Sequence, residues 1–427
     1  MAAILCAMAL AGPAPAASSD PLRLHQWGLD MIHADEAHAV TTGAGAVVAV
    51  VDTGVDASHP DLRGRIGPGI DFVDGDSTPQ DGNGHGTHVS GIIAADANNG
   101  IGVDSVAPGA EIMPVRVLDA SGSGSDSDVA KGIDWAVDHG ASVINLSLGG
   151  TVPTSGLGIQ DDISAAVQRA VGRGVVVVAA AGNDGLPFCE NDSEQGKVLC
   201  VGAVDKRGSR TFYSSFGAGL SLVAPGGSAM PGTDEDVLST WPGGGYQELA
   251  GTSQATPHVS GVAALLVSLG VRGQAAVQRI LATATDLGAP GPDPVYGAGL
   301  VNAQAAVAGL APPSGAQGVG GVGRRSASAH ISVRRVQGIR GVLRRGILVT
   351  CSGGSGRCSA SASYRHRRIA HGSARLAAGR PARVRARVNR RGRTILRRAL
   401  RTRHRVHATV RVRMPGATAR RRVVLVP

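Results

Sequence analysis

Residues 46–51 read Ala-Val-Val-Ala-Val-Val, a continuous apolar run that is rich in β-branched side chains. Such a run predicts a strand that is buried on both faces of a parallel sheet. Similar runs occupy residues 112–118, 142–148 and 175–181, and stretches with apolar residues three and four apart lie between them, at 126–138 and 161–171. This alternation predicts an α/β fold, a three-layer, doubly wound domain with a mainly parallel sheet and right-handed crossovers.

The charge of the chain is divided between two regions. The 427 residues carry a formal net charge of +10. Residues 312–427 contain 29 arginines and no lysine, aspartate or glutamate, whereas the first 311 residues hold the other 13 basic side chains and all 32 acidic ones, a formal charge of −19. The basic overall balance therefore describes neither region and does not by itself indicate a nucleic-acid-binding protein.

The two ends of the chain differ in composition from the α/β region. Residues 1–19 include an apolar stretch followed by Ala14-Pro15-Ala16-Ala17, which predicts a cleavable signal peptide although no positive charge precedes it. No apolar run is long enough for a membrane span. We expect an α/β domain at 20–310, a Pro/Gly-rich linker at 311–328 and a basic region at 329–427. Alternating stretches at 381–388 and 407–413 predict that the basic region is a small β-sandwich, and a disordered basic tail is the alternative.

Four of the five cysteines lie in two close pairs, Cys189 with Cys200 and Cys351 with Cys358. In an exported chain this spacing predicts two local disulfides. In a cytosolic chain the same residues would be small, buried hydrophobic side chains.

Polar side chains follow the buried segments at three places. Asp52 ends the first apolar run, His85 opens a segment that can continue as a helix, and Ser253 precedes a helix rich in Ala, Leu and Val. Thr252 or Ser253 is expected to cap that helix, with Pro257 near its first turn. Chemistry in doubly wound sheets collects at the carboxyl ends of the strands. A serine becomes a nucleophile when a histidine accepts its proton and a carboxylate orients the histidine, and these three residues could supply that set.

The segments around these residues resemble the three signature motifs of the subtilisin-like serine proteases. They read Asp52-Thr-Gly-Val-Asp56, His85-Gly-Thr-His-Val-Ser-Gly91 and Gly251-Thr-Ser-Gln-Ala-Thr-Pro-His258, and the likeness covers residues 20–308. The resemblance implies a subtilisin-like fold and a secreted or cell-surface serine endopeptidase that acts on polypeptides, as a monomer and without a catalytic cofactor. It implies Ser253 as the nucleophile, His85 as general base and then acid, and Asp52 as the orienting carboxylate.

Further positions match the family one at a time. Asn183, which ends Ala179-Ala-Ala-Gly-Asn183, matches the asparagine of the oxyanion hole. Two segments match the edges that pair with an extended substrate, Gly122-Ser123-Gly124 and Ser147-Leu148-Gly149. The acidic segment 190–194 either borders the pocket for the residue before the scissile bond, which would favour basic side chains there, or forms a solvated loop.

The resemblance also implies one structural calcium ion. Oxygen ligands are expected from a carboxylate, an amide side chain and several carbonyl groups, with a second carboxylate whose spacing departs by one residue. In that order, these ligands are Asp61, Asn99, the carbonyls of Ala97, Ile101 and Val103, and Asp20.

Two features depart from the family pattern. Gln254 stands directly after the nucleophile, where the family usually has Met, and this amide would need a hydrogen-bond partner or solvent. The mature-like sequence also begins near residue 20, where secreted members have an inhibitory pro-segment first. Either the chain folds without such a segment or its start is incomplete.

A binding protein is the alternative function. Its α/β domain would be a catalytically inactive subtilase, and its arginines would anchor it to an anionic cell-surface polymer or to nucleic acid. Tyr364 is the only aromatic residue of the basic region, so specific recognition of single-stranded nucleic acid is not expected. No triad member is missing, so we expect an active protease with the basic region as an accessory.

Overall fold

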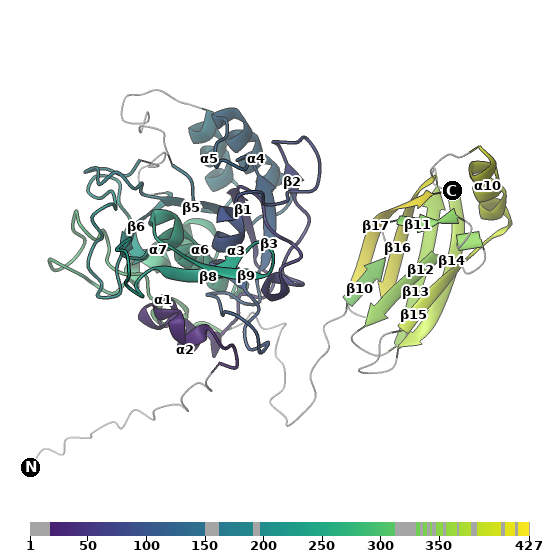
Figure 1. The fold of residues 1–427 in the computed structure, drawn as a ribbon. Helices are drawn as coiled ribbons and strands as arrows, with labels where there is room; N and C mark the ends of the chain where they lie inside the picture. Colours follow the sequence, from purple (N-terminus) through teal and green to yellow (C-terminus); the bar gives the residue numbers. More distant parts are fainter. Residues whose placement is uncertain are drawn as a thin grey trace, which may run out of the picture. The chain divides into compact units, whose positions relative to one another are not determined.

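The structure is a computed structural model, and it describes residues 18–149, 162–190, 197–311 and, with short gaps, 330–426. The gaps in the last range are 334–335, 340–341, 344–346, 353–355, 365–366, 377–381, 403–405 and 415–416. The chain divides into two compact units near residue 318 (Figure 1).

A seven-stranded parallel sheet forms the centre of the first unit, with the strand order β2-β3-β1-β4-β5-β6-β7. Its strands are β1 (Val47–Asp52), β2 (Ile70–Asp71), β3 (Glu111–Arg116), β4 (Val143–Leu146), β5 (Val176–Ala180), β6 (Leu199–Val204) and β7 (Leu222–Pro225). An antiparallel pair, β8 (Val237–Trp241) and β9 (Gly245–Leu249), stands apart from it. The apolar run at 46–51 therefore lies inside the sheet, as the sequence predicts.

Helices cover both faces of this sheet. Val48 and Val50 of β1 lie in one core with α3, α6 and α7, whereas Ala49 and Val51 lie in a second core with α4 and α5. Each buried valine side chain contributes about 1.5–3 kcal/mol to stability. The helices are η1 (Arg23–His25), α1 (Trp27–Met31), α2 (Ala34–His38), η2 (Pro60–Leu62), α3 (His85–Ala94), α4 (Asp126–Asp138), α5 (Asp162–Gly172), α6 (Thr252–Ser268), α7 (Gly273–Ala282) and α8 (Ala303–Val307). The predicted three-layer α/β architecture is confirmed.

Helix α6 begins differently from the expectation. Gly251 occupies its N-cap, so Thr252 and Ser253 lie in the first turn and neither caps the helix. Pro257 lies in the second turn, where its missing N–H leaves the Ser253 carbonyl without an intrahelical donor. The Ser147 hydroxyl donates to that carbonyl (2.8 Å). This hydrogen bond ties the loop after β4 to the start of α6.

The second unit is a β-rich domain with the strand order β10-β12-β15-β14-β13-β16-β17-β11. Its strands are β10 (His330–Val333), β11 (Val336–Gly338), β12 (Ile347–Ser352), β13 (Gly356–Tyr364), β14 (Arg367–Leu376), β15 (Ala382–Val388), β16 (Val406–Met414) and β17 (Ala417–Val426). Along β15 the apolar side chains are buried and the exposed Arg385 and Arg387 alternate with them. The prediction of a β-rich C-terminal domain with half-buried strands is confirmed for the described residues.

One helix of this unit was not predicted. Helix α10 (Arg390–Arg401) begins after Asn389, whose side chain accepts a hydrogen bond from the Gly392 N–H (2.8 Å). It buries Leu396 in the core of the unit and leaves its arginines exposed. The dense arginines of this stretch obscure the apolar positions from which a helix could have been predicted.

Cys189 and Cys200 form the predicted disulfide. Cys358 is also disulfide-bonded, whereas the side chain of its predicted partner, Cys351, lies outside the described part. No single helix in the described ranges is both long and apolar enough to cross a membrane, and α6 with α7 meets those criteria only as a bent pair.

Candidate active site

Asp52 and His85 meet where the carboxyl end of β1 faces the first residue of α3. His85 Nδ1 lies 2.9 and 3.0 Å from the two carboxylate oxygens of Asp52. Asp52 is fully buried and also accepts a hydrogen bond from the Thr53 N–H (2.7 Å). A carboxylate only accepts, so Nδ1 of His85 donates, and Nε2 is the nitrogen that can take up a proton.

The surroundings raise the pKa of His85 above its usual value of 6.5. Burial is the largest single influence and lowers the pKa, but the charge and hydrogen bond of Asp52 and the charge of Asp81 together outweigh it. His88 lies one turn further along α3, and burial lowers its pKa to about 3. His88 therefore stays neutral and adds no positive charge beside His85.

Asp81 organises this region, and the sequence analysis missed it. Its side chain accepts five hydrogen bonds, from the Thr53 hydroxyl, the N–H groups of Asn83, Gly84 and Thr87, and the Thr87 hydroxyl. These bonds join the end of β1 to the first turn of α3, which fixes Asp52 relative to His85. An acidic residue shortly before a helix start, in Asp81-Gly-Asn-Gly-His85, is the signal that could have identified it.

Ser253 and His85 line one cleft with a volume of about 480 Å³. This volume is typical of ligand sites. Both predicted substrate segments also line this cleft: Gly122, Ser123, Gly124, Ser147, Leu148 and Gly149. The Ser253 hydroxyl donates to the Ser147 carbonyl (3.3 Å). Among the described residues, no hydrogen bond joins the side chains of Ser253 and His85. The structure therefore brings His85, Ser253 and both predicted substrate segments to one cleft, and the Ser253 side chain faces Ser147.

Asn183 lies beside the start of α6. Its Oδ1 accepts hydrogen bonds from the N–H and the hydroxyl of Thr252 (2.9 and 3.0 Å). These two donors fix the orientation of the amide, and Nδ2 donates no hydrogen bond to any described residue. Asn183 is exposed, although it does not line the cleft itself. The amide is thus held with its donor end available.

Two polar residues near the site are buried. Glu190 accepts a hydrogen bond from the Ser215 hydroxyl (2.8 Å) and is only 7% exposed, so the prediction of a solvated loop is wrong for this residue. Its carboxylate lies against Gly182 and does not line the cleft, and residues 191–194 fall outside the described ranges.

Gln254 is 2% exposed, and its Nε2 has no hydrogen-bond partner among the described residues. This is contrary to the expectation that the amide would find a hydrogen-bond partner or solvent.

The 97–103 loop folds around two buried carboxylates, Asp61 and Asp20. The donors to Asp61 are Asn99 Nδ2 (2.6 Å), the Val103 N–H (2.9 Å) and the Tyr246 hydroxyl (3.1 Å), and the donors to Asp20 include the N–H groups of Asn98 and Gly100. No described lysine or arginine forms an ion pair with either carboxylate, and burial raises the pKa of Asp61. Two desolvated carboxylates on one loop fit calcium in donor type, although Asn99 presents its amide nitrogen to Asp61.

Comparisons with known proteins identify relatives of the first unit. A family model described as "Subtilase family" matches residues 43–299. Thermitase from Thermoactinomyces vulgaris is 47% identical over 245 residues, which are 57% of this chain and 83% of thermitase. Subtilisin Savinase from Lederbergia lenta is 46% identical over 283 residues, 66% of this chain and 97% of that protein. Among solved structures, a protease from Pseudoalteromonas arctica PAMC 21717 superposes with a TM-score of 0.62 at 34% identity, and the match covers 68% of this chain and 98% of that one.

Proposed function

The chain belongs to the subtilase family of serine endopeptidases, and from that premise we propose that Asp52, His85 and Ser253 cleave polypeptides through an acyl-enzyme. The observation that carries this proposal is the single cleft lined by His85, Ser253 and both substrate segments. The hydrogen-bonded Asp52 lies behind His85.

The first step requires a rotation of Ser253. Its hydroxyl leaves the Ser147 carbonyl, to which it donates at 3.3 Å, and turns toward Nε2 of His85. Nε2 accepts the serine proton as Oγ attacks the substrate carbonyl, and it later protonates the leaving amine. The positive charge on His85 forms beside the buried carboxylate of Asp52, which stabilises it.

The negatively charged oxygen of the tetrahedral intermediate needs hydrogen-bond donors. Asn183 Nδ2 and the Ser253 N–H at the start of α6 are the groups that we assign to this role. Thr252 supports the assignment because it occupies Oδ1 of Asn183 and so turns Nδ2 outward. Loss of one such donor in a subtilisin lowers kcat by about 100-fold to 1,000-fold.

The substrate would bind as an added strand between residues 122–124 and 147–149. Gly124 supports this pairing because it packs closely on the Val117 carbonyl, where a Cβ would clash at 2.3 Å. Asp119 accepts hydrogen bonds from the N–H groups of Ser121 and Ser123, which shapes the first edge. Backbone pairing of this kind accepts many sequences, with pockets for alternate side chains setting the preference.

A peptide library incubated with the purified chain tests activity and subsite preference together. We expect cleavage products from the intact chain and none above background from Ser253→Ala. Ser209→Ala is the matched control, because it removes an exposed hydroxyl that does not line the cleft and keeps the nucleophile. Equal cleavage by Ser253→Ala would overturn the mechanism.

Calcium would bind at the 97–103 loop. We assign Asp61, Asn99, Asp20 and the carbonyls of Ala97, Ile101 and Val103 as its ligands. Bound calcium would neutralise the buried carboxylates and stabilise the loop, and it takes no part in catalysis. The buried carboxylate of Asp61, with which no described lysine or arginine forms an ion pair, supports this assignment.

Secretion and polymer binding complete the proposal. Residues 1–19 would be a signal peptide, and the disulfide between Cys189 and Cys200 is consistent with an oxidising compartment.

The second unit would hold an anionic cell-surface polymer, because none of its 29 arginines has an acidic side chain within 312–427 to pair with.

A further inference from the structure

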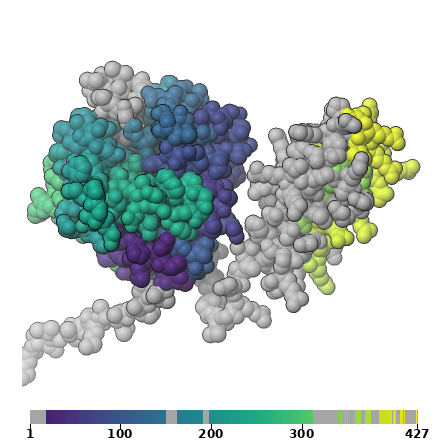
Figure 2. Space-filling view, in the orientation of Figure 1, coloured from purple at the N-terminus to yellow at the C-terminus, as the bar shows by residue number. Residues whose placement is uncertain are grey.

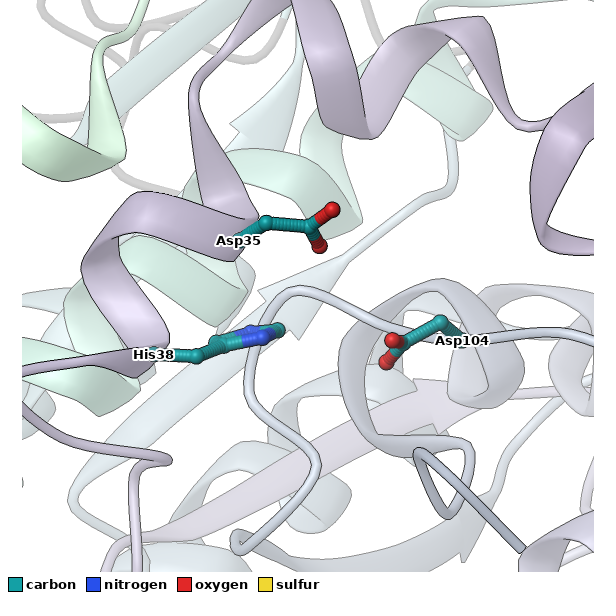
Figure 3. Close-up of side chains that lie close together, drawn as sticks. All are labelled: Asp35, His38 and Asp104. Atoms are coloured by element: carbon teal, nitrogen blue, oxygen red, sulfur yellow. The ribbon is translucent and has the colours of Figure 1, made fainter. Parts of the chain in front are cut away.

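A second group of chemically active side chains lies away from the cleft, where α2 meets the residue that follows the 97–103 loop. Asp35 and His38 lie three residues apart on α2 and therefore share a face. One ligand atom from each of them and one from Asp104 all lie within 4.8 Å of one another. Figure 3 shows the two carboxylates and the imidazole pointing toward a common space.

His38 is oriented by a backbone group. Its Nε2 lies 3.0 Å from the Val106 carbonyl, which only accepts, so Nε2 carries the proton and Nδ1 presents its lone pair. No hydrogen bond or ion pair within the described residues joins this imidazole to Asp35 or Asp104. An imidazole that donates through one nitrogen to a backbone carbonyl, with the other nitrogen left to bind, is typical of metal ligands.

Asp104 independently indicates a missing ligand. It is 2% exposed, yet only one carboxylate oxygen accepts a hydrogen bond, from the Ser105 N–H (2.6 Å). The other oxygen accepts no hydrogen bond from a described donor and is therefore left to bind a ligand or water. The Gln26 side chain holds the backbone of Asp104 through its N–H (2.7 Å) and its carbonyl (2.8 Å). The carboxylate is therefore fixed in place.

Charge and access favour a divalent cation. Arg23 donates to Asp30 (2.5 Å) and to Asp35 (2.9 Å). Asp30, Asp35 and Asp104 together bring three carboxylates, and Arg23 is the one described arginine that pairs with any of them. Asp35 and His38 are partly exposed, and the N-terminal helices lie on the surface of the first unit, in purple in Figure 2. An ion could therefore enter from solvent.

We propose that Asp35, His38 and Asp104 bind a first-row divalent metal ion of the zinc type. An imidazole and two carboxylates are ligands that zinc takes, and a water would complete a four-coordinate site. Bonds of about 2.1 Å place tetrahedral ligands about 3.4 Å apart, so ligand atoms that lie within 4.8 Å of one another would approach by at most about 1.4 Å on binding. The ion would tie α2 to the residue after Val103, at a site distinct from the oxygen-only calcium set.

The test uses the full chain with Ser253→Ala, so that self-cleavage cannot interfere. The protein is stripped with a chelator, re-equilibrated with calcium to fill the oxygen site, and titrated with Zn²⁺ by calorimetry. A parallel titration with Co²⁺ follows the visible absorption that nitrogen and oxygen ligands produce. His38→Ala and Asp104→Asn remove ligands, and His25→Ala is the matched control because His25 is an exposed histidine outside the cluster.

We expect one equivalent of tightly bound Zn²⁺ and a Co²⁺ spectrum in the parent chain and in His25→Ala. His38→Ala and Asp104→Asn should each weaken binding by at least about 10-fold to 100-fold. If the parent chain shows no Co²⁺ absorption spectrum, the proposal is overturned, whatever the variants show. Equal Zn²⁺ affinity in His38→Ala and His25→Ala overturns it as well, since the ion would then bind elsewhere.

Discussion

Asp81→Asn tests whether one buried carboxylate holds the two halves of the site together. Asparagine keeps a single acceptor oxygen, so at least two of the five hydrogen bonds that Asp81 accepts are lost. Hydrogen bonds to a charged group contribute about 1.5–3 kcal/mol each, which predicts a loss of at least about 3 kcal/mol in the free energy of unfolding. Urea unfolding in the Ser253→Ala background measures this loss.

The matched control is Asp76→Asn. Asp76 is an exposed acid whose side chain accepts one hydrogen bond, from the Thr78 N–H (2.7 Å), so its replacement should cost less than about 1 kcal/mol. With the nucleophile intact, Asp81→Asn should also shift the acidic limb of kcat/KM to lower pH, because the charge of Asp81 helps to raise the pKa of His85. An effect of Asp81→Asn no larger than that of Asp76→Asn, with an unmoved pH profile, would refute the reasoning.

Three further predictions concern pH, calcium and the second unit. In the intact chain kcat/KM should rise with pH as His85 loses its proton, with a midpoint above 6.5 that Asp52→Asn lowers; a midpoint below 6.5 in the intact chain contradicts the assigned surroundings of His85. A chelator should lower the Tm of the Ser253→Ala chain, and the added substitution Asp61→Asn should remove that response. An equal Tm shift in the two proteins would mean that the ion binds elsewhere. Deletion of residues 312–427 should spare peptide hydrolysis and weaken retention on an anionic matrix at low salt, and unchanged retention would leave the 29 arginines without a binding role.

The layers of the first unit could be predicted because buried parallel strands are unambiguous. Val48 and Val50 face one core and Ala49 and Val51 the other, so every position of the run at 46–51 is apolar. The strand ends then follow, and with them the position of Asp52. These features can be predicted because they depend on residues that are contiguous in the sequence.

Features that depend on distant contacts could not be predicted. The position of Asp81 before a helix start is visible in the sequence, but its partners are not, because Thr53 and Thr87 converge on it only in the folded chain. The predicted cap of α6 was wrong because the helix begins at Thr252, directly after Gly251. The donor to the carbonyl that Pro257 leaves free is the Ser147 hydroxyl, from 106 residues away, and the sequence gives no sign of it. Asp35, His38 and Asp104 likewise meet only in the folded chain.

Covalent labelling of the full chain by a serine-directed phosphonylating reagent tests the central claim most directly. Mass spectrometry of the digested product should locate one adduct, on Ser253, and His85→Ala should suppress its formation because the proton acceptor is gone. An adduct on another residue, or labelling of Ser253 at an undiminished rate in His85→Ala, would contradict the proposed triad.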